Sequence, residues 1–210
     1  MQSFPTIYKK IQYALNDLPA DLAHKEMYPL RKTRNEMKLE NEDYRTSAVL
    51  ALMFQEDGET KMILTQRHDY KGKHGGQISF PGGKSEATDQ SIEHTALRET
   101  QEEIGLPTED INIIGKLSDV YIPVSQFLVH PFIAYYNGDP TFIRSEYEVK
   151  EIITFNTAIL LDSDTMSRRN IKTSEGYSLK DIPCFIIEEK IVWGATAIIL
   201  NEIRHILMRA

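Results

Sequence analysis

Four charged residues within six positions carry the strongest chemical signal in this chain: Arg98, Glu99, Glu102 and Glu103. In an α-helix, at about 100° per residue, Glu99 and Glu103 project only ~40° apart and Glu102 lies roughly 60° to one side. The three carboxylates therefore share one face, where they repel one another. Hard divalent cations prefer carboxylate oxygens and also bind phosphate, so this face suits a metal site as well as it suits a solvated acidic surface.

The segments around these residues must position them. Gly82 and Gly83 precede the helix and would let the backbone turn sharply and approach a phosphate. The opposite side of the same helix carries an apolar stripe that would face a core. That stripe consists of Ala96, Leu97, Thr100 and Ile104. The glycine turn beside the acidic face favours metal-assisted phosphate chemistry over a surface helix.

The segment that ends in RETQEEIGL, residues 98–106, resembles the Nudix box: G, five residues, E, seven residues, then REUXEEXGU with U aliphatic. Thr100 stands at the first aliphatic position. Counting back from Arg98 places the box glutamate on Gln90, with six residues after Gly83 instead of five. Asp89 is the nearest acid, so we interpret the difference as a one-residue insertion, which leaves the role of that first acid open.

The segment before the box resembles the signature of the coenzyme A pyrophosphatases, LLTxR, then S or A, three residues, R, three residues, G, three residues, FPGG. Residues 63–83 match its spacing from end to end, and residues 191–197, IVWGATA, look like the IWGxTA segment of that subfamily. Two letters differ, because His68 stands in place of S or A and Gly72 in place of the second arginine. Lys71 and Lys73 flank Gly72 and would partly supply its charge.

The resemblance implies a hydrolase that uses Mg²⁺ or Mn²⁺ on a phosphoanhydride bond. It assigns Glu99 and Glu103 as the main metal ligands and Glu102 as a further ligand, directly or through water. Arg98 would orient a box glutamate, with an ordinary surface ion pair as the alternative.

A further acid on a later loop, acting as general base or extra ligand, is implied by the same resemblance. Glu148 is the candidate, and Glu146 and Glu151 are close enough in sequence to compete. The base could instead be Glu102 or Glu99, because sequence alone does not separate a ligand from a base.

Substrate contacts are carried over from the subfamily motif. They fall on Arg67, His74, Gly82 and Gly83. A strand-end arginine such as Arg67 is also commonly just solvated, and no role for His74 can be derived from its type alone.

Length and composition favour one domain, with residues 1–43 as an N-terminal helix and connection packed on a Nudix hydrolase domain at 44–210. A net charge of −7 argues against nucleic acid as a partner. No apolar run is long enough for a bilayer, and Cys184 is the single cysteine, so the sequence predicts a cytoplasmic protein without a membrane partner. A homodimer is left open.

Apolar periodicity predicts the elements. Helices are expected at residues 5–17, from Asp89 or Gln90 to Gly105 with Asp89 as the cap, briefly after Asn156, and at 195–208. Strands are expected at residues 48–54, 61–66, 77–80, 111–117, 129–136, 152–155 and around 184–188, with a hairpin turn at Asp57 and Gly58 and a surface connection at 19–43. The fold class is therefore α/β (α+β), with a mixed sheet sandwiched between helices, which is also the Nudix fold.

The resemblance thus implies cleavage of coenzyme A, or its acyl or oxidised forms, to 3′,5′-ADP and 4′-phosphopantetheine or its derivative. The small-molecule substrate could instead be another nucleoside diphosphate derivative, such as ADP-ribose, a dinucleotide or a dinucleoside polyphosphate. A different class is a nucleotide-sensing Nudix domain that does not cleave. The intact carboxylates and the lack of a DNA-binding segment argue against a sensor.

Overall fold

The structure, a computed structural model, describes residues 4–28, 44–69 and 75–209. It opens with two short helices, α1 (Phe4–Ala14) and α2 (Ala20–Met27). The expected N-terminal helix is confirmed as α1, three residues shorter at its end. None of the helices in this part of the chain is long and apolar enough to cross a membrane.

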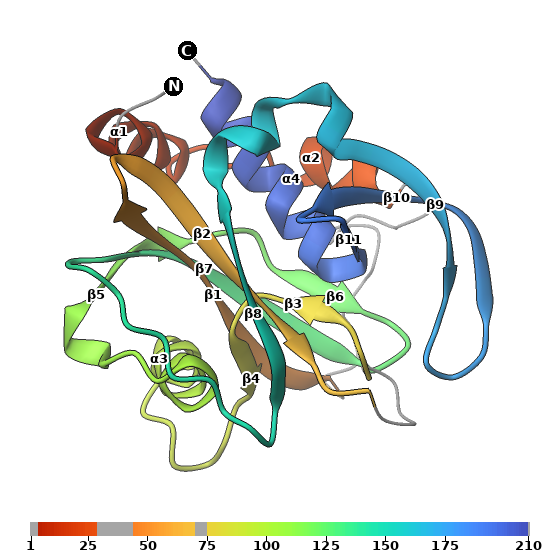
Figure 1. The fold of residues 1–210 in the computed structure, drawn as a ribbon, viewed down its shortest axis with the longest axis horizontal. Coiled ribbons are helices and arrows are strands. Elements are labelled where there is room, and N and C mark those ends of the chain that lie inside the picture. The colour runs from red at the N-terminus through yellow and green to blue at the C-terminus, as the bar shows by residue number, and fades with distance from the viewer. Residues whose placement is uncertain (1–3, 29–43, 70–74, 210) are drawn as a thin grey trace.

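Within the described residues, eight strands form one mixed sheet (Figure 1). Strand β1 (Arg45–Glu56) runs parallel to β7 (Phe127–Tyr136) on one side and antiparallel to β2 (Glu59–Arg67) on the other, and β8 (Val149–Asn156) pairs with β2. The sheet is completed by β3 (Ile78–Ser79), β4 (Gly82–Lys84), β5 (Ile111–Lys116) and β6 (Val120–Ile122). The predicted mixed sheet is confirmed.

A smaller antiparallel sheet follows in the chain. Its order is β11-β10-β9, formed by β9 (Met166–Lys172), β10 (Ser178–Ile187) and β11 (Lys190–Trp193). The helical segments that remain are α3 (Ile92–Ile104), α4 (Gly194–Met208) and the 3-10 turns η1 (Thr108–Asp110), η2 (Thr157–Leu161) and η3 (Ser163–Thr165). The C-terminal helix and the short helix after Asn156 are as predicted.

The large sheet is buried on both faces, which explains the continuous apolar run in β1. Ala48, Leu50, Leu52 and Phe54 pack toward α3 in one core cluster, together with Ala96 and Ile104 of that helix. The residues between them belong to a second cluster shared with α1, α4 and the small sheet. Among the α-helices of the described residues, α3 therefore covers one face of the sheet, and α1, α2 and α4 lie beyond the opposite face (Figure 1).

Two sequence expectations differ from the structure. Residues 19–43 were expected to form only a surface connection, yet α2 forms there because Ala23 and Met27, one turn apart, are buried. Helix α2 packs on α4, so burial rather than a long apolar pattern stabilises it. The short strands β4, β6, β9 and β11 were not predicted, since strands of this kind depend on their partners more than on their own residues.

The predicted hairpin between β1 and β2 is confirmed. Asp57 and Gly58 both have positive φ, 52° and 77°, as a two-residue turn between antiparallel strands requires. This hairpin sets the register of β2, whose last residues lie beside the acidic helix.

Candidate active site

Helix α3 begins at Ile92, and Ser91 caps it by accepting a hydrogen bond from the backbone N–H of His94 at 3.0 Å. The expectation of Asp89 as the cap is therefore wrong. At the other end Gly105 adopts φ +72° and donates its N–H to the carbonyl of Gln101, as predicted for a glycine terminator. Three of the four stripe residues, Ala96, Thr100 and Ile104, are buried, so the acidic face points away from this core.

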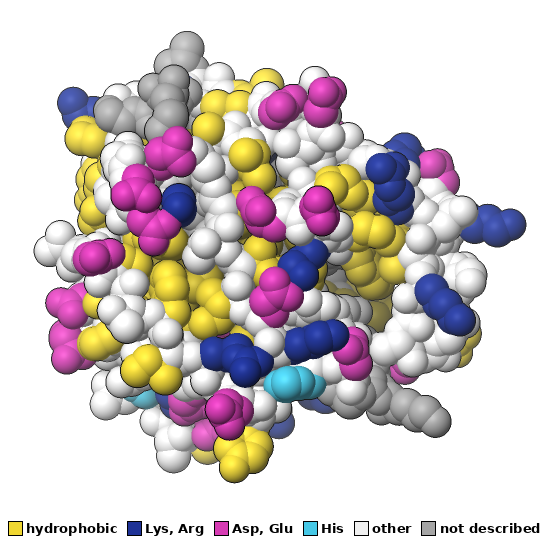
Figure 2. Space-filling model, viewed as in Figure 1, with side chains coloured by type: hydrophobic (Ala, Val, Ile, Leu, Met, Phe, Trp, Pro, Cys, Tyr) yellow, Lys and Arg dark blue, Asp and Glu magenta, His cyan; other side chains and the backbone are white. Residues whose placement is uncertain are grey.

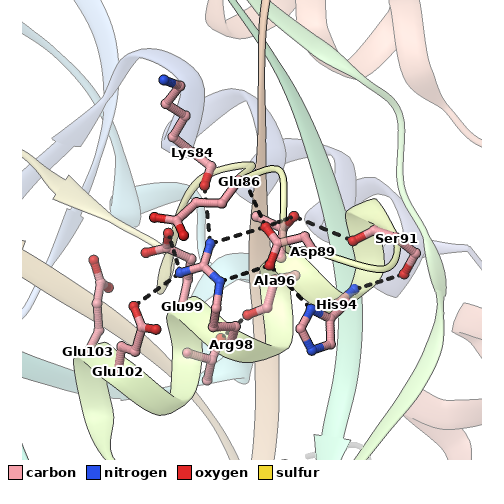
Figure 3. A network of polar contacts seen from close by, with 12 residues as sticks. Lys84, Glu86, Asp89, Ser91, His94, Ala96, Arg98, Glu99, Glu102 and Glu103 are labelled. Atoms are coloured by element: carbon pink, nitrogen blue, oxygen red, sulfur yellow. Dashed lines mark hydrogen bonds and ion pairs between the residues drawn. The ribbon is translucent and has the colours of Figure 1, made fainter.

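Asp89 instead anchors Arg98 (Figure 3). Its side chain is 1% exposed and accepts hydrogen bonds from Arg98 Nε at 2.9 Å and from the Thr95 hydroxyl at 2.8 Å. The guanidinium of Arg98 holds the pKa of this carboxyl well below its usual range. The sequence left the role of the first box acid open, because the insertion places Asp89 one position from the box glutamate when counted from Arg98. The spacing from Gly83, with five residues between, could have identified Asp89.

The other side of the Arg98 guanidinium faces the helix carboxylates. Its Nη1 lies 3.0 Å from Glu99 Oε1 and 3.1 Å from Glu102 Oε2. Arg98 thus links the loop before the helix to two of its glutamates (Figure 3). Such charge-assisted contacts fix the Glu99 carboxylate in one orientation.

Three carboxylates come together beside this network. Among the described residues, Glu99, Glu103 and Glu148 form the one group of metal-ligating side chains whose ligand atoms all lie within 4.8 Å of one another. Burial raises the pKa of Glu103 to about 7 and also raises the pKa of Glu99. Clustered, partly dehydrated carboxylates need positive charge, and an all-oxygen donor set fits a hard divalent cation such as Mg²⁺ or Mn²⁺.

Glu103 is held by the end of β2. The Thr65 hydroxyl donates to Glu103 Oε2 at 3.2 Å, and Arg67 Nη1 lies 3.5 Å from Oε1. Arg67, expected as a substrate contact, therefore lies against the carboxylate cluster, with 30% of its side chain exposed. Both residues belong to the motif that resembles the coenzyme A signature, so that motif and the acidic helix meet at one place.

The two glycines do not form a plain turn; they allow neighbouring atoms to approach the backbone closely. They lie in β4, where Gly82 and Gly83 pair with Val49 and Ala48 of β1. A Cβ on Gly82 would lie 2.3 Å from the carbonyl oxygen of Ala48, and one on Gly83 would lie 2.3 Å from Glu99 Oε2. The missing side chains leave room for the sheet backbone and for the Glu99 carboxylate.

Glu148 lies on the loop between β7 and β8, and this loop is hydrogen-bonded to the end of α3. The N–H of Ser145 donates to the carbonyl of Glu103 and that of Ile143 to the carbonyl of Ile104, both at 2.9 Å. The loop enters β8 at Val149, whose N–H donates to the carbonyl of Ser145 at 3.0 Å. These backbone bonds tie the loop that carries Glu148 to the C-terminal end of α3.

The remaining predicted residues lie outside the cluster. Glu102 is 53% exposed and bonds Arg98, Glu151 pairs with Lys190 at 2.8 Å, and Glu146 has its carbonyl turned toward His68. His74 and Gly72 fall outside the described residues. Geometry therefore separates Glu148 from its two neighbours, which the sequence did not do.

Comparison with known proteins identifies the family of this chain. Residues 44–172 match the model of the NUDIX domain. The chain is 33% identical over 156 residues to human "Mitochondrial coenzyme A diphosphatase NUDT8", covering 73% of this chain and 66% of that protein. It is 31% identical over 146 residues to "Uncharacterized Nudix hydrolase NudL" of Yersinia enterocolitica, covering 69% of this chain and 73% of that protein.

Among solved structures, a MutT/nudix family protein from Enterococcus faecalis superposes with a TM-score of 0.52 at 18% identity, covering 99% of this chain and 75% of that chain. This likeness shows the fold. The chain belongs to the Nudix family, and it is a hydrolase that cleaves pyrophosphate linkages. The predicted family and enzyme class are confirmed, as is the similarity to coenzyme A pyrophosphatases.

Burial of the Glu103 carboxylate predicts that the free energy of unfolding of the metal-free protein depends on pH. The folded state holds this proton up to about pH 7 and the unfolded state releases it near 4.5, so stability falls as pH rises between these values. Glu103→Gln should therefore raise the free energy of unfolding at pH 8 by on the order of 2 kcal/mol, and by less at pH 5.

Thermal melts in EDTA at the two pH values measure this effect. The exposed Glu102→Gln is the matched control and should change stability little at either pH. Added Mn²⁺ should stabilise the wild type and not Glu103→Gln. A destabilised Glu103→Gln at pH 8 would show that the carboxylate is a structural partner rather than a desolvated anion.

The close approach of the Glu99 carboxylate to Gly83 predicts that Gly83→Ala displaces Glu99. The new methyl would overlap a flexible side chain, so the fold should survive while the carboxylate moves off the cluster. We expect Mn²⁺ affinity and kcat to fall by about 10-fold or more, with a melting temperature within a few degrees of wild type. Ser85→Ala, just beyond the same strand, is the control, and unchanged Mn²⁺ binding in Gly83→Ala would contradict the role of Glu99.

Proposed function

We propose that this protein hydrolyses the pyrophosphate bond of coenzyme A, or of its acyl or oxidised forms, with a divalent metal. The observation that carries the proposal is the contact of Thr65 and Arg67 with Glu103. It joins the motif that resembles the coenzyme A signature to the carboxylates of the Nudix helix. The similarity to a human protein named as a coenzyme A diphosphatase supports the same substrate.

Glu99, Glu103 and Glu148 are proposed to hold the metal, with Glu102 at the edge of the site. A bound Mg²⁺ or Mn²⁺ would neutralise charge on the pyrophosphate and acidify a water. The chain's own residues position these ligands. Asp89 holds Arg98, which orients Glu99, and Thr65 and Arg67 orient Glu103. Glu148, on the exposed side, is proposed as a further ligand or as the base that accepts the proton of the attacking water.

Substrate recognition is proposed for Arg67 and for the backbone at Gly82 and Gly83, with His74 included from the motif. Arg67 lies within 3.5 Å of Glu103, so a phosphate next to the metal cluster would also lie within its reach. A guanidinium there would contact both a carboxylate and a phosphate oxygen.

Two further expectations remain proposals. A single domain, in which residues 1–43 pack on the hydrolase part at 44–210, is supported by Ile7 and Ile11, which are buried in the core cluster shared with α4. A reducing cytoplasm is proposed from the single cysteine, Cys184, although the human relative is named as mitochondrial. A homodimer stays open.

A substrate panel tests the function. With Mg²⁺ or Mn²⁺ present, coenzyme A should give 3′,5′-ADP and 4′-phosphopantetheine, separated by chromatography. Dephospho-coenzyme A lacks the 3′-phosphate and should show a lower kcat/KM, because charge-assisted contacts to that phosphate go unmade. The loss should be modest, because Gly72 stands where the resembling motif has an arginine. Turnover of ADP-ribose or a dinucleotide without coenzyme A would transfer the proposal to those nucleoside diphosphate derivatives.

Three single substitutions test the loop acid. Glu148→Gln should lower kcat by at least about 10-fold, because its oxygen belongs to the metal-binding group. Glu146→Gln and Glu151→Gln are matched controls on the same segment and should stay within about 3-fold of wild type. If Glu151→Gln proves the most damaging, the helix carboxylates keep their assignment and Glu148 loses it.

A further inference from the structure

Glu148 differs from the other two cluster members in how it is held. Glu103 is 1% exposed and fixed by side chains, and Glu99 is bound by Arg98. Glu148 is exposed, on the loop that connects β7 to β8. The position of its carboxylate therefore depends on what fixes the loop backbone.

The α3 side of the loop is fixed by the two backbone bonds to Glu103 and Ile104. The opposite side faces the end of β2, where polar and charged side chains gather on the lower part of the face in Figure 2. There His68 Nε2 lies 2.9 Å from the carbonyl oxygen of Glu146. A carbonyl only accepts, so Nε2 carries the proton and donates to the loop two residues before Glu148.

The strand pairing places this contact beside the cluster. Arg67 pairs with Val149, and the register of β2 and β8 shifts at this point, so that Lys150 is an extra residue on β8. Such a bulge re-aims the neighbouring side chains. His68 directly follows Arg67, so its ring reaches from the end of β2 to the loop just before that loop enters β8.

We propose that His68 is a positioning residue, which holds the Glu148 loop against the metal cluster by donating to the Glu146 carbonyl. The serine or alanine usual at this position in the resembling motif cannot donate from the distance that an imidazole Nε2 reaches. The departure at His68 thus has a structural use in this chain. The inference rests on the proposed role of Glu148.

A second contact crosses the same junction and supplies a control. Lys150 Nζ lies 2.5 Å from Asp69 Oδ2, and 45% and 69% of these side chains are exposed. Exposed ion pairs of this kind contribute little. Removing it changes the surface beside the loop without freeing the Glu146 carbonyl.

The experiment compares His68→Asn, His68→Gln and Lys150→Gln in otherwise intact protein. A glutamine amide nitrogen reaches about as far from Cα as imidazole Nε2, and an asparagine amide reaches only as far as Nδ1. We expect His68→Asn to lower kcat and Mn²⁺ affinity by about 10-fold, with KM little changed. His68→Gln should stay within about 3-fold and Lys150→Gln within about 2-fold of wild type.

A double-mutant cycle with Glu148→Gln shows whether His68 acts through Glu148. Mn²⁺ titration followed by electron paramagnetic resonance provides a readout besides activity. In the Glu148→Gln background, His68→Asn should have almost no further effect on either quantity. Additive effects, or a His68→Gln as damaging as His68→Asn, would overturn the inference.

The cycle also separates this inference from the proposed function. If Glu148→Gln is damaging and His68→Asn is not, only the role of His68 fails. If Glu148→Gln itself leaves kcat and Mn²⁺ affinity at wild-type values, the assignment of Glu148 fails and the role of His68 falls with it. Either result is read on whichever pyrophosphate compound the wild type turns over.

Discussion

The structure depends on holding three carboxylates together against their mutual repulsion. Their ligand atoms lie within 4.8 Å of one another, and burial adds a desolvation cost that raises the pKa of both Glu99 and Glu103. A helix alone would rotate or fray to separate such charges. Here α3 is fixed by its buried stripe against the sheet and by definite ends at Ser91 and Gly105.

Each carboxylate is held by a different kind of contact. Glu103 meets a hydroxyl and a guanidinium from the end of β2, Glu99 meets Arg98, and Glu148 is carried by a loop whose backbone bonds to the end of α3. The Asp89–Arg98 pair adds a further constraint, since the Asp89 carboxylate, itself nearly inaccessible, accepts hydrogen bonds from the guanidinium. Contacts of this kind would orient the carboxylates before a cation binds, which would favour geometrically selective metal binding.

The same arrangement reconciles a net charge of −7 with an anionic substrate. A bound divalent cation would reverse the local field, so the acidic cluster would then attract pyrophosphate. Arg67 borders the cluster and adds positive charge where the motif resembling the coenzyme A signature meets the Nudix helix. Family membership establishes the class of reaction, and the proposed specificity for coenzyme A would depend on contacts around this junction.

The sequence by itself determined the family, the mixed sheet between helices, and the helix that carries Glu99 and Glu103, because periodicity and a long motif are local properties of the chain. It also predicted Arg67, His74, Gly82 and Gly83 as substrate contacts, which stay predictions. It could not find α2, which is stabilised by burial against α4. It also missed the cap at Ser91 and the short strands β4, β6, β9 and β11, whose own residues carry no clear pattern. Only the tertiary structure decided that Asp89 anchors Arg98, that Glu148 rather than Glu146 or Glu151 joins the cluster, and that His68 contacts its loop. These are contacts between segments that strand register and the docking of α3 bring together, so they depend on the folded chain.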